Sequence, residues 1–408
     1  MLKKTIGFAV WILLAGIALV FPTWAQTTQA SPAATVTSEA QASPTATPAL
    51  EPPLKFSMNA LVDTYYSLNF TNAAHGLDGA GNTGYFPNNQ GDYNYNLHMA
   101  ELAFTLRQGE GSVHLSVLGG NVAKYFNSLA GSPPVGDNIF LYEAYATYHP
   151  EDWTFSFGRM ASFMGFEVLE SNQDWNYSRS LLYTLTLPYL QEGFSINYTA
   201  PNNKVAITGY ALDGWNDGGT GLSSNAGKTF GLKFEGDPSP DFKIVLNGIT
   251  GPTGLAPFND DLFARSVIEG TMICKASDDI SIALDGEFIS QNPNGLQTFE
   301  GWGGALYCRY QFKPDWAAVL RLEGIKIEAP SPNYIYLGSS SLPVVTNDEG
   351  REVTLTLEHH FTKHFLARIE GRYDYALSDG QVFTVGNGPF AGGDPNQITI
   401  TASVIFSL

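Results

Sequence analysis

From residue 54 to the carboxyl terminus, hydrophobic and polar residues alternate along the chain in runs of about ten residues. The last run, 397–408, shows the pattern most clearly. Its even-numbered residues, from Ile398 to Leu408, are all apolar, and most of the residues between them are Thr or Ser. A period of two is typical of a β-strand with one apolar and one polar face. At a chain end, where soluble domains are usually frayed and polar, such a strand indicates a sheet whose outer face contacts lipid.

About sixteen runs of this kind can be counted, and each predicts a strand. The segment 181–187 could form a further strand, but an odd number would break the closed pattern, and we assign it to a long loop. Lengths near ten residues are what a tilted membrane-spanning strand requires. The predicted strands are 54–70, 95–108, 112–120, 139–148, 153–160, 193–199, 204–212, 228–236, 241–249, 263–276, 279–290, 299–312, 315–328, 351–361, 364–375 and 397–408.

The connections between these runs alternate between short turns and long loops. Aromatic residues flank the short turns, as Phe312 and Trp316 do at one turn and Phe361 and Phe365 at another. Short periplasmic turns, long extracellular loops and aromatic girdles are typical of an outer-membrane barrel. A soluble β-sandwich also alternates, but it need not place aromatic pairs at every second connection. The sequence therefore predicts an all-β fold, a transmembrane antiparallel barrel of about sixteen strands.

The amino-terminal region predicts export from the cytoplasm. A short basic start, an apolar run over 6–20 and small residues up to Ala25 indicate a secretory signal peptide at 1–25. The Thr-, Ala-, Ser- and Pro-rich segment 26–53 has almost no large apolar residue and predicts a flexible linker, placed in the periplasm. A secreted chain can span a membrane without a helix only as a closed barrel. We therefore expect the barrel, 54–408, in the outer membrane.

Composition supports a membrane protein and excludes some partners. Charged residues make up 15% and aromatic residues 13%, whereas soluble domains have a charged share of about 25%. The net charge of −18 argues against binding nucleic acid. Cys274 and Cys308 fall on predicted lipid-facing positions with one strand between them. That separation, ~9.5 Å, is too long for a disulfide, and both are expected to be unpaired.

Motifs for catalysis or metal binding are sparse. The chain has no Gly-x-Ser-x-Gly elbow, no His-Glu-x-x-His motif and no glycine-rich phosphate loop. His359, His360 and His364 are close in sequence, but a predicted turn separates the last from the others. We therefore expect no enzymatic activity, no cofactor and no metal ion.

The polar faces of many strands carry charges of both signs. In the run 364–375, Arg368, Glu370, Arg372 and Asp374 share one face. Charges at this density inside a sheet need water or partners, so the lumen is either an aqueous pore or a salt-bridged plug. Sixteen strands leave a channel of aqueous width, which favours the pore.

The segment 161–192 is the most distinctive of the long loops because it mixes apolar, aromatic and acidic residues. A loop with its own apolar anchors can fold back and pack, and inside a barrel it would narrow the pore. Its acids would then face arginines of the wall across the aperture, although an external lid would have similar anchors. The predicted pore constriction consists of Glu167, Glu170, Asp174 and Arg179 of this segment and Arg107, Arg321, Arg368 and Arg372.

The same region carries a family resemblance. The positions that carry it are Gly158-Arg159-Met160, Gly165-Phe166-Glu167, Tyr177-Ser178-Arg179-Ser180, Pro188 and Gly193. This pattern resembles the OmpL-like family of β-barrel porins, whose members commonly have Gly-Lys-Phe at the first of these positions. The resemblance extends over nearly all of the chain after Pro53. It implies a bacterial outer-membrane barrel of porin type and does not supply a substrate.

Two classes of function follow. The first is a porin for passive diffusion of small hydrophilic solutes or ions, with a mild cation preference because of its net acidity. The second is a barrel with a blocked lumen that acts as a surface adhesin or as an outer-membrane enzyme. The last strand resembles the assembly signal of outer-membrane barrels through Phe406 and Leu408, although that signal usually ends in Phe. Expected partners are membrane lipid, the barrel assembly machinery, small solutes and, in a homotrimer, further copies of the chain.

Overall fold

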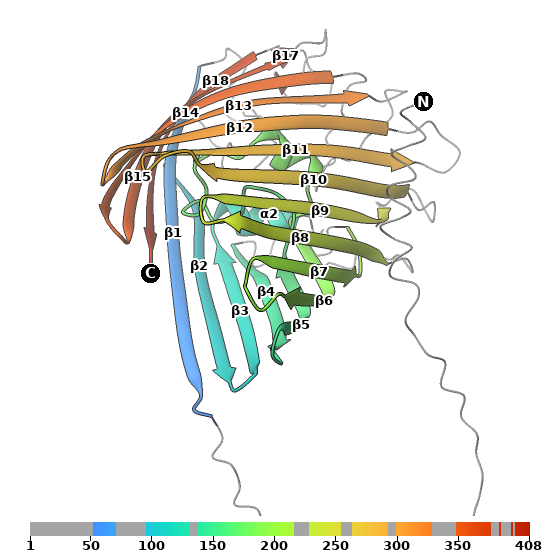
Figure 1. Ribbon diagram of the computed structural model, residues 1–408. Helices are drawn as coiled ribbons and strands as arrows, with labels where there is room; N and C mark the ends of the chain where they lie inside the picture. The colour runs from blue at the N-terminus through green and yellow to red at the C-terminus, as the bar shows by residue number, and fades with distance from the viewer. Residues whose placement is uncertain are drawn as a thin grey trace, which may run out of the picture. The chain divides into compact units, whose positions relative to one another are not determined.

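The barrel is closed and antiparallel. A computed structural model describes residues 52–70, 95–129, 138–215, 228–253, 263–292, 299–328, 348–376, 383–384, 393–394 and 396–408. Within them, sixteen strands form the barrel, which closes where β1 (Lys55–Asn69) pairs with β18 (Asn396–Ser407) (Figure 1). The predicted transmembrane barrel of about sixteen strands is confirmed. The predicted signal peptide and nearly all of the predicted linker lie outside the described residues.

Each strand pairs with its sequence neighbour, and bounds differ from the predicted ones by only a few residues. A separate short pair consists of β16 (Phe383–Thr384) and β17 (Gly393–Asp394). The other strands are β2 (Tyr95–Gln108), β3 (Gly111–Gly119), β4 (Ile139–Tyr148), β5 (Trp153–Ala161), β6 (Leu190–Thr199), β7 (Val205–Leu212), β8 (Thr229–Ser239), β9 (Phe242–Thr253), β10 (Phe263–Lys275), β11 (Ile280–Asn292), β12 (Phe299–Lys313), β13 (Trp316–Glu328), β14 (Asp348–Thr362) and β15 (Phe365–Ala376).

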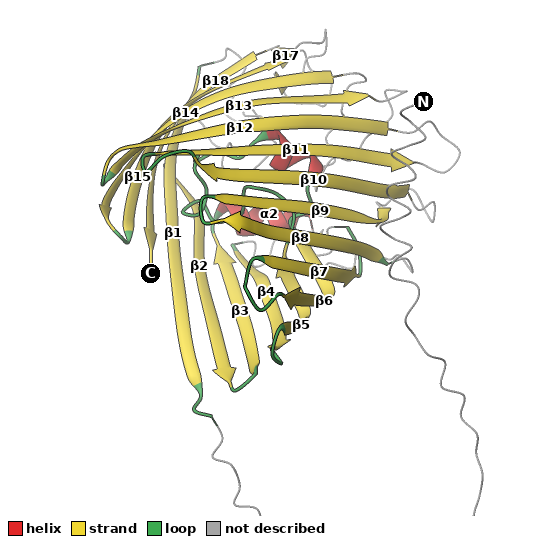
Figure 2. Ribbon diagram, viewed as in Figure 1, coloured by secondary structure: helices red, strands yellow, loops and turns green. Residues whose placement is uncertain are grey.

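Within the described residues, two helices that the sequence pattern did not predict lie inside the barrel (Figure 2). They are α2 (Asn121–Leu129) and α3 (Leu181–Thr186). Ser180 caps α3, because its side chain accepts the N–H of Tyr183 at 3.0 Å. The prediction that 181–187 is not a further strand is therefore confirmed. No helix of the described residues is long and apolar enough to cross a membrane.

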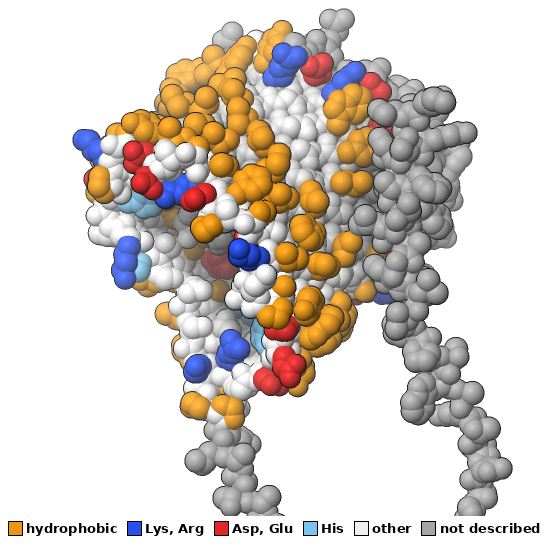
Figure 3. All heavy atoms as spheres, in the orientation of Figure 1, with side chains coloured by type: hydrophobic (Ala, Val, Ile, Leu, Met, Phe, Trp, Pro, Cys, Tyr) orange, Lys and Arg blue, Asp and Glu red, His pale blue; other side chains and the backbone are white. Residues whose placement is uncertain are grey.

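The outer face is largely hydrophobic, with charged side chains towards the edges of the face in view (Figure 3). The aromatic pairs at the short turns contact one another, with ring centroids 6.3 Å apart for Phe312 and Trp316 and 5.5 Å apart for Phe361 and Phe365. Cys274 and Cys308 are both free. They pair with the same residue of the intervening strand from opposite sides, as predicted.

The barrel wall is uneven in length. Strands β3 to β7 contain 8 to 10 residues, whereas β10 to β15 contain 12 to 15.

The inner face is also uneven in its exposure to solvent. Most inward side chains of β10–β15 and β18 are buried, as are those of β1 from Leu61 onward, whereas Lys55, Ser57 and Asn59 of β1 are exposed and many inward side chains of β2–β8 are half-exposed. Material inside the barrel therefore covers one half of the wall and leaves the other half accessible.

Candidate pore constriction

The loop between β5 and β6, residues 162–189 and named L3 below, runs into the barrel and covers the buried half of its wall. Its backbone and side chains bond inward residues of β1, β10, β11 and β13–β15. The loop position inside the barrel, rather than outside as a lid, follows from these contacts.

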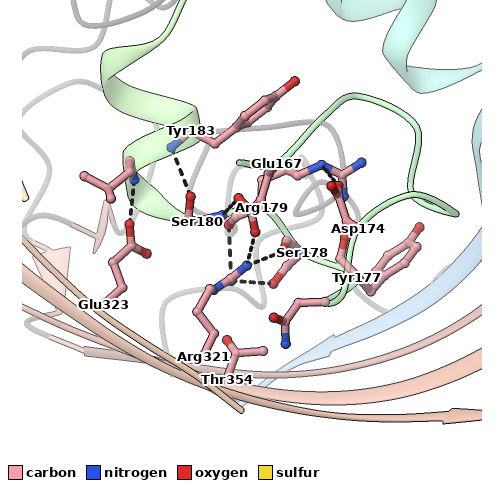
Figure 4. A network of polar contacts seen from close by, with 12 residues as sticks. Glu167, Asp174, Tyr177, Ser178, Arg179, Ser180, Tyr183, Arg321, Glu323 and Thr354 are labelled. Carbon is pink, nitrogen blue, oxygen red and sulfur yellow. Dashed lines mark hydrogen bonds and ion pairs between the residues drawn. The ribbon is translucent and has the colours of Figure 1, made fainter. Parts of the chain in front are cut away.

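Arg321 of β13 lies at the centre of the attachment (Figure 4). Its guanidinium group bonds Glu352 of the neighbouring strand at 2.7 Å and Glu167 of L3 at 2.6 Å. It also donates to the carbonyl of Ser178 at 2.6 Å. All of these side chains are buried, so each charge is compensated directly by its partners rather than by water.

Two wall carboxylates bind consecutive amide groups of L3. Glu370 of β15 accepts the N–H groups of Tyr177 and Ser178 at 2.7 and 2.9 Å. Glu323 of β13 accepts the N–H groups of the first two residues of α3 at 2.8 and 2.6 Å. The first amides of a helix have no partner within it, and a carboxylate there also favours the helix dipole. The wall therefore fixes the backbone of L3, not only its side chains.

Two further arginines of β15 bind carbonyl groups of L3. Arg368 donates to the carbonyls of Ser171 and Asp174, and Arg372 donates to the carbonyl of Arg179. Each of the two arginines also pairs with a strand carboxylate, at 2.8 Å and 2.7 Å respectively. The wall therefore binds both amide and carbonyl groups of L3. Without these partners, a long stretch of buried loop would have backbone polar groups that lack hydrogen bonds.

Glycines of the wall make room for apolar anchors of L3. A Cβ atom added at Gly231 of β8 would lie 2.5 Å from the ring of Phe163, and one at Gly303 of β12 would lie 2.5 Å from Leu182. Glycine within a strand weakens it and often marks a place where another group approaches closely. The two glycines thus leave space on two separate strands for apolar side chains of L3.

Arg179 holds L3 together from inside. It donates to the carbonyls of Val168, Leu169 and Tyr177 at 2.6 to 2.7 Å, and it forms an ion pair with Asp174 at 2.8 Å. Since both charges belong to the loop and both are buried, this pair shapes L3 and does not face the lumen.

A serine, a histidine and an aspartate meet where L3 contacts β1, but not in a catalytic order. Ser171 donates to Asp63 at 2.6 Å, and His98 lies 3.9 Å from the same carboxylate. A nucleophilic triad needs the serine hydroxyl on the histidine. Here the serine hydroxyl donates to one carboxylate oxygen of Asp63, and the hydroxyl of Tyr177 donates to the other at 3.2 Å. The side chains of the serine, the histidine, the aspartate and the tyrosine are all buried. This group anchors the loop.

Glu170 differs from the other two predicted acids of L3. It is half-buried and forms no ion pair within the described part of the chain. Burial, followed by repulsion from Glu101 of β2 and Glu143 of β4, raises the pKa of Glu170 to about 7. Glu143 also lies 3.3 Å from His114 of β3. Carboxylates of the loop and of the accessible wall therefore converge here.

Seven of the eight predicted constriction residues lie in L3 or bond it. Glu170 is one of the seven, but its charged neighbours are acids and not arginines. The prediction for Arg107 is wrong: it is exposed near the short turn after β2 and donates to Gly109 O at 3.4 Å. The expectation that acids and arginines face each other across an open aperture is also wrong for Glu167 and Arg321, because they are in direct contact.

Sequence reasoning did not identify the residues that receive L3. Glu370 was placed with the inward charges of its strand, but neither Glu370 nor Glu323 was identified as an acceptor for backbone amides. Gly231 and Gly303 were not singled out, although a glycine at an inward strand position is a signal for close approach.

The accessible half of the wall is polar and weakly charged. Hydroxyl and amide side chains bond one another across its strands, as Thr147 does with Ser156 at 3.3 Å and Asn197 with Thr208 at 2.8 Å. Such a surface can exchange hydrogen bonds with water or with polar solutes. Among the described residues, no cluster of three His, Cys, Asp or Glu side chains could hold a metal ion.

A closed sixteen-stranded barrel with lipid-facing apolar side chains, a polar inner face and an inward loop defines an outer-membrane barrel of porin type. Residues 55–408 match the family described as "Putative beta-barrel porin-2, OmpL-like", and the chain belongs to that family. The prediction from sequence resemblance is confirmed.

Solved porin structures share the fold at low identity. The anion-selective porin from Comamonas acidovorans is 11% identical, with a TM-score of 0.57 over 87% of this chain and 100% of that one. The outer membrane channel DcaP of Acinetobacter baumannii is 12% identical, with a TM-score of 0.55 over 87% and 97%. The trimer form of OmpT, an outer membrane protein of Vibrio cholerae, is 11% identical, with a TM-score of 0.54 over 87% and 99%. No curated protein matches the chain.

Proposed function

We propose that this porin passes small hydrophilic solutes by passive diffusion through an aqueous passage between L3 and the inner face of β2–β8. The observation that carries the proposal is the contrast in burial between the two halves of the inner wall. L3 covers most of the inner face of β10–β15 and the adjoining part of β1, while inward hydroxyl, amide and carboxylate groups of β2–β8 stay accessible. A passage bounded by such groups favours polar solutes over apolar ones.

The charge of this passage favours cations mildly. Glu101, Glu143 and Glu170 lie close enough to repel one another, and among the residues that the structure describes they have a single ion-pair partner, His114, which lies 3.3 Å from Glu143. Rings of carboxylates favour cations in channels. The effect is limited in range, because salt screens charges beyond ~8–10 Å.

The proposed activity requires no catalysis. The family is one of porins, and the serine, histidine and aspartate that meet near β1 are buried in an order that gives no activated nucleophile. A blocked-lumen barrel remains the alternative function, and it predicts no solute flux.

Liposome swelling distinguishes the diffusion porin from the barrel with a blocked lumen. Purified protein is reconstituted into liposomes, which are then diluted into isotonic solutions of neutral sugars of increasing size. We expect swelling that slows steeply with sugar size, because L3 narrows the passage. No swelling with the smallest sugar, at a protein density that gives swelling with a known porin, would support the blocked barrel instead.

The proposed location is the outer membrane, reached with an amino-terminal signal peptide and with the linker 26–53 in the periplasm. In the last strand, Phe406 pairs with Val62 of β1 and Phe365 of β15, and its side chain is exposed on the outer face. Leu408 donates to Ala60 O at 2.9 Å. We propose that Phe406 and Leu408 form the signal read by the barrel assembly machinery.

A substitution pair tests that signal. Phe406→Asp places a charge on the lipid face and should sharply lower the amount of protein in the outer membrane, whereas Phe406→Leu should not. Normal abundance and normal heat resistance of the Asp variant in detergent would contradict the assignment.

We propose a homotrimer that associates through the short strands β3–β7. Arg159 and Glu192 form an ion pair at 2.7 Å, and their register places them on the same face as the exposed Phe157 and Phe194. Charges on a lipid-facing surface are costly, and a second copy would cover them. The OmpT structure in trimer form supports this assembly by analogy.

Light scattering in mild detergent tests the assembly. Wild type should have the mass of three chains, and Phe157→Arg should shift the mass towards one chain. The control Phe361→Arg changes an aromatic residue at the periplasmic turn on the long-strand side and should remain trimeric. A monomeric wild type would contradict the proposal.

A further inference from the structure

The helix α2 belongs to the second long loop, yet it lies inside the barrel beside L3 (Figure 2). Gly120 directs the chain inward after β3 with a φ of +93°, a left-handed conformation that glycine adopts without strain. An added Cβ there would lie 2.9 Å from the carbonyl oxygens of Leu97 and His98. The inward turn at the end of β3 therefore requires glycine, both because φ is positive and because there is no space for a Cβ atom.

One face of α2 packs on the inner wall. Val122, Ala123 and Phe126 are buried and lie on one side of the helix. The ring of Phe126 is 5.1 Å from that of Phe140 and 6.4 Å from that of Tyr142, both inward residues of β4. The helix thus covers part of the inner surface of β2–β4.

The other contact of α2 is with the return of L3. Tyr189 lies 6.3 Å from Phe126 and 6.4 Å from Tyr125, measured between ring centroids. The same tyrosine accepts the N–H of Ser162 with its carbonyl at 3.0 Å, which joins the two ends of L3. It also donates its hydroxyl to Thr184 O at 2.8 Å. The two loops therefore interlock at Tyr189.

Lys124 lies on the helix face opposite the packed residues. It is exposed, and it forms no ion pair within the described part of the chain. Tyr142, the wall residue on which Phe126 packs, is followed in β4 by Glu143, whose carboxylate lies 3.3 Å from His114 of β3. A basic charge and an acidic group therefore lie on either side of the same packed helix.

We propose that α2 is the second wall of the constriction and that Lys124 is a specificity-determining residue, whose charge offsets the cation preference set by the acids. The inference rests on the proposed passive-diffusion function and adds Lys124, a positive charge, to the groups that determine the ion selectivity of the passage. L3 then bounds the passage on one side, α2 on another and the inner face of β5–β8 on the third.

Reversal potentials across a planar bilayer in a KCl gradient test the charge. Lys124→Gln should raise the cation-to-anion permeability ratio about two- to five-fold, and Lys124→Glu should raise it further. The reason is that a unit charge separated from a passing ion by several ångströms of water changes the energy of that ion by about the thermal energy or somewhat more. The matched control is Lys204→Gln in an exposed periplasmic turn, which should leave the ratio unchanged. Equal ratios for wild type and both Lys124 variants would overturn the proposal.

A second pair tests the position of the helix. Phe126→Ala removes the ring that holds α2 between the wall and Tyr189 and should increase single-channel conductance and current noise. Phe126→Tyr keeps the ring and should restore the wild-type trace. Identical conductance for Phe126→Ala and wild type would show that α2 does not bound the passage.

Thiol labelling distinguishes failure of this inference from failure of the proposed function, because it needs no conductance. Lys124→Cys is made in a chain whose two native cysteines are replaced by Ala, and it is treated from outside with maleimides of increasing size. A small maleimide should react and a polyethylene-glycol maleimide of several kilodaltons should be excluded. Rapid reaction with the large reagent would overturn the inference, even if wild type proved to be non-conducting.

Discussion

The two halves of the barrel interior differ in how many charged side chains they hold and in what those side chains contact. Along β13–β15, arginines and carboxylates bond L3 and each other and are removed from water, as Arg321 is with Glu167 and Glu352. Along β2–β8, fewer charges occur, and Glu101, Glu143 and His114 stay partly exposed. The density of inward charge therefore marks where the loop is fixed, and the half with fewer charges and more exposed side chains is where we propose that solutes pass.

The distinction matters for reading selectivity from a porin sequence. Acids such as Glu167 and Asp174 are neutralised within 3 Å by arginines of the wall or of the loop, so they contribute little field to the passage. Glu170, a few residues away, has no such partner in the described chain and faces other acids. Residue type alone therefore does not show whether an acid fixes the loop or contributes charge to the passage. The partner of its carboxylate shows which of the two it does.

The largest effect is expected for Arg321→Ala. It leaves Glu167 and Glu352 buried without their shared cation, which costs about 3–5 kcal/mol in comparable buried pairs, and it frees the backbone of L3. The temperature of unfolding in detergent, followed by gel mobility, should fall markedly, and conductance should rise. The control Arg351→Ala removes an exposed ion pair at the rim, for which at most about 1 kcal/mol is expected. Equal effects of the two substitutions would break the comparison between the halves.

The next effect concerns glycines on the two faces of the wall. Gly303→Ala forces a Cβ to within 2.5 Å of Leu182 and 2.8 Å of the Gly324 carbonyl, and overpacking of this kind costs about 1–3 kcal/mol. Gly371→Ala on the outer face meets nothing within 4 Å and should be neutral or slightly stabilising. Thermal unfolding of the two variants measures the difference. A Gly303 variant as stable as the Gly371 variant would show that L3 does not press on the wall at this point.

Two sets of carboxylates can then be exchanged for amides. Neutralising Glu101, Glu143 and Glu170 together should shift the reversal potential towards anions with little loss of stability. Neutralising Glu167 and Asp174 should lower stability and should shift the potential less, because their charges are already paired. If the second set shifted the potential more than the first, the passage would lie on the arginine-rich side of L3.

The smallest effect is the pH dependence of selectivity. Because burial and neighbouring acids raise the pKa of Glu170 to about 7, this group is mostly protonated at about pH 6 and mostly ionised at about pH 8. The cation-to-anion ratio should therefore rise with pH across this window in wild type. The rise should be reduced in Glu170→Gln, measured in the same bilayer experiment. A wild type with a flat ratio would place Glu170 away from the ion path.

The fold was predictable because alternation with a period of two is a local signal that survives in every strand, up to Phe406 in the last one. The sequence predicted that L3 packs through apolar anchors such as Phe163 and Leu182, but it did not decide between a position inside the barrel and an external lid, because both would bury those anchors. The location of Arg107 could have been predicted by counting, since it lies two residues before Gly109 of a short turn and hence at the barrel end. Its inward charge alone was misleading.

Other features depend on contacts that a local pattern does not contain. The aperture between acids and arginines was expected from charge sign, but charge sign does not say whether Glu167 reaches Arg321 directly. The helix α2 falls in a segment whose length predicts a loop, and only the turn at Gly120 and the packing of Phe126 on Phe140 place it inside the barrel. These contacts form between segments far apart in sequence or through backbone geometry.

Single-channel recording of a loop-deleted porin tests the central claim most directly. Residues 166–187 are replaced by a short Gly-Ser spacer, which removes the part of L3 bound by Arg321, Glu323 and Glu370, while the strands β5 and β6 remain. The account predicts that wild type opens discrete channels and that the deletion variant, correctly inserted and heat-resistant, has a several-fold larger conductance. A wild type without channels, or a deletion variant with the wild-type conductance, would contradict it.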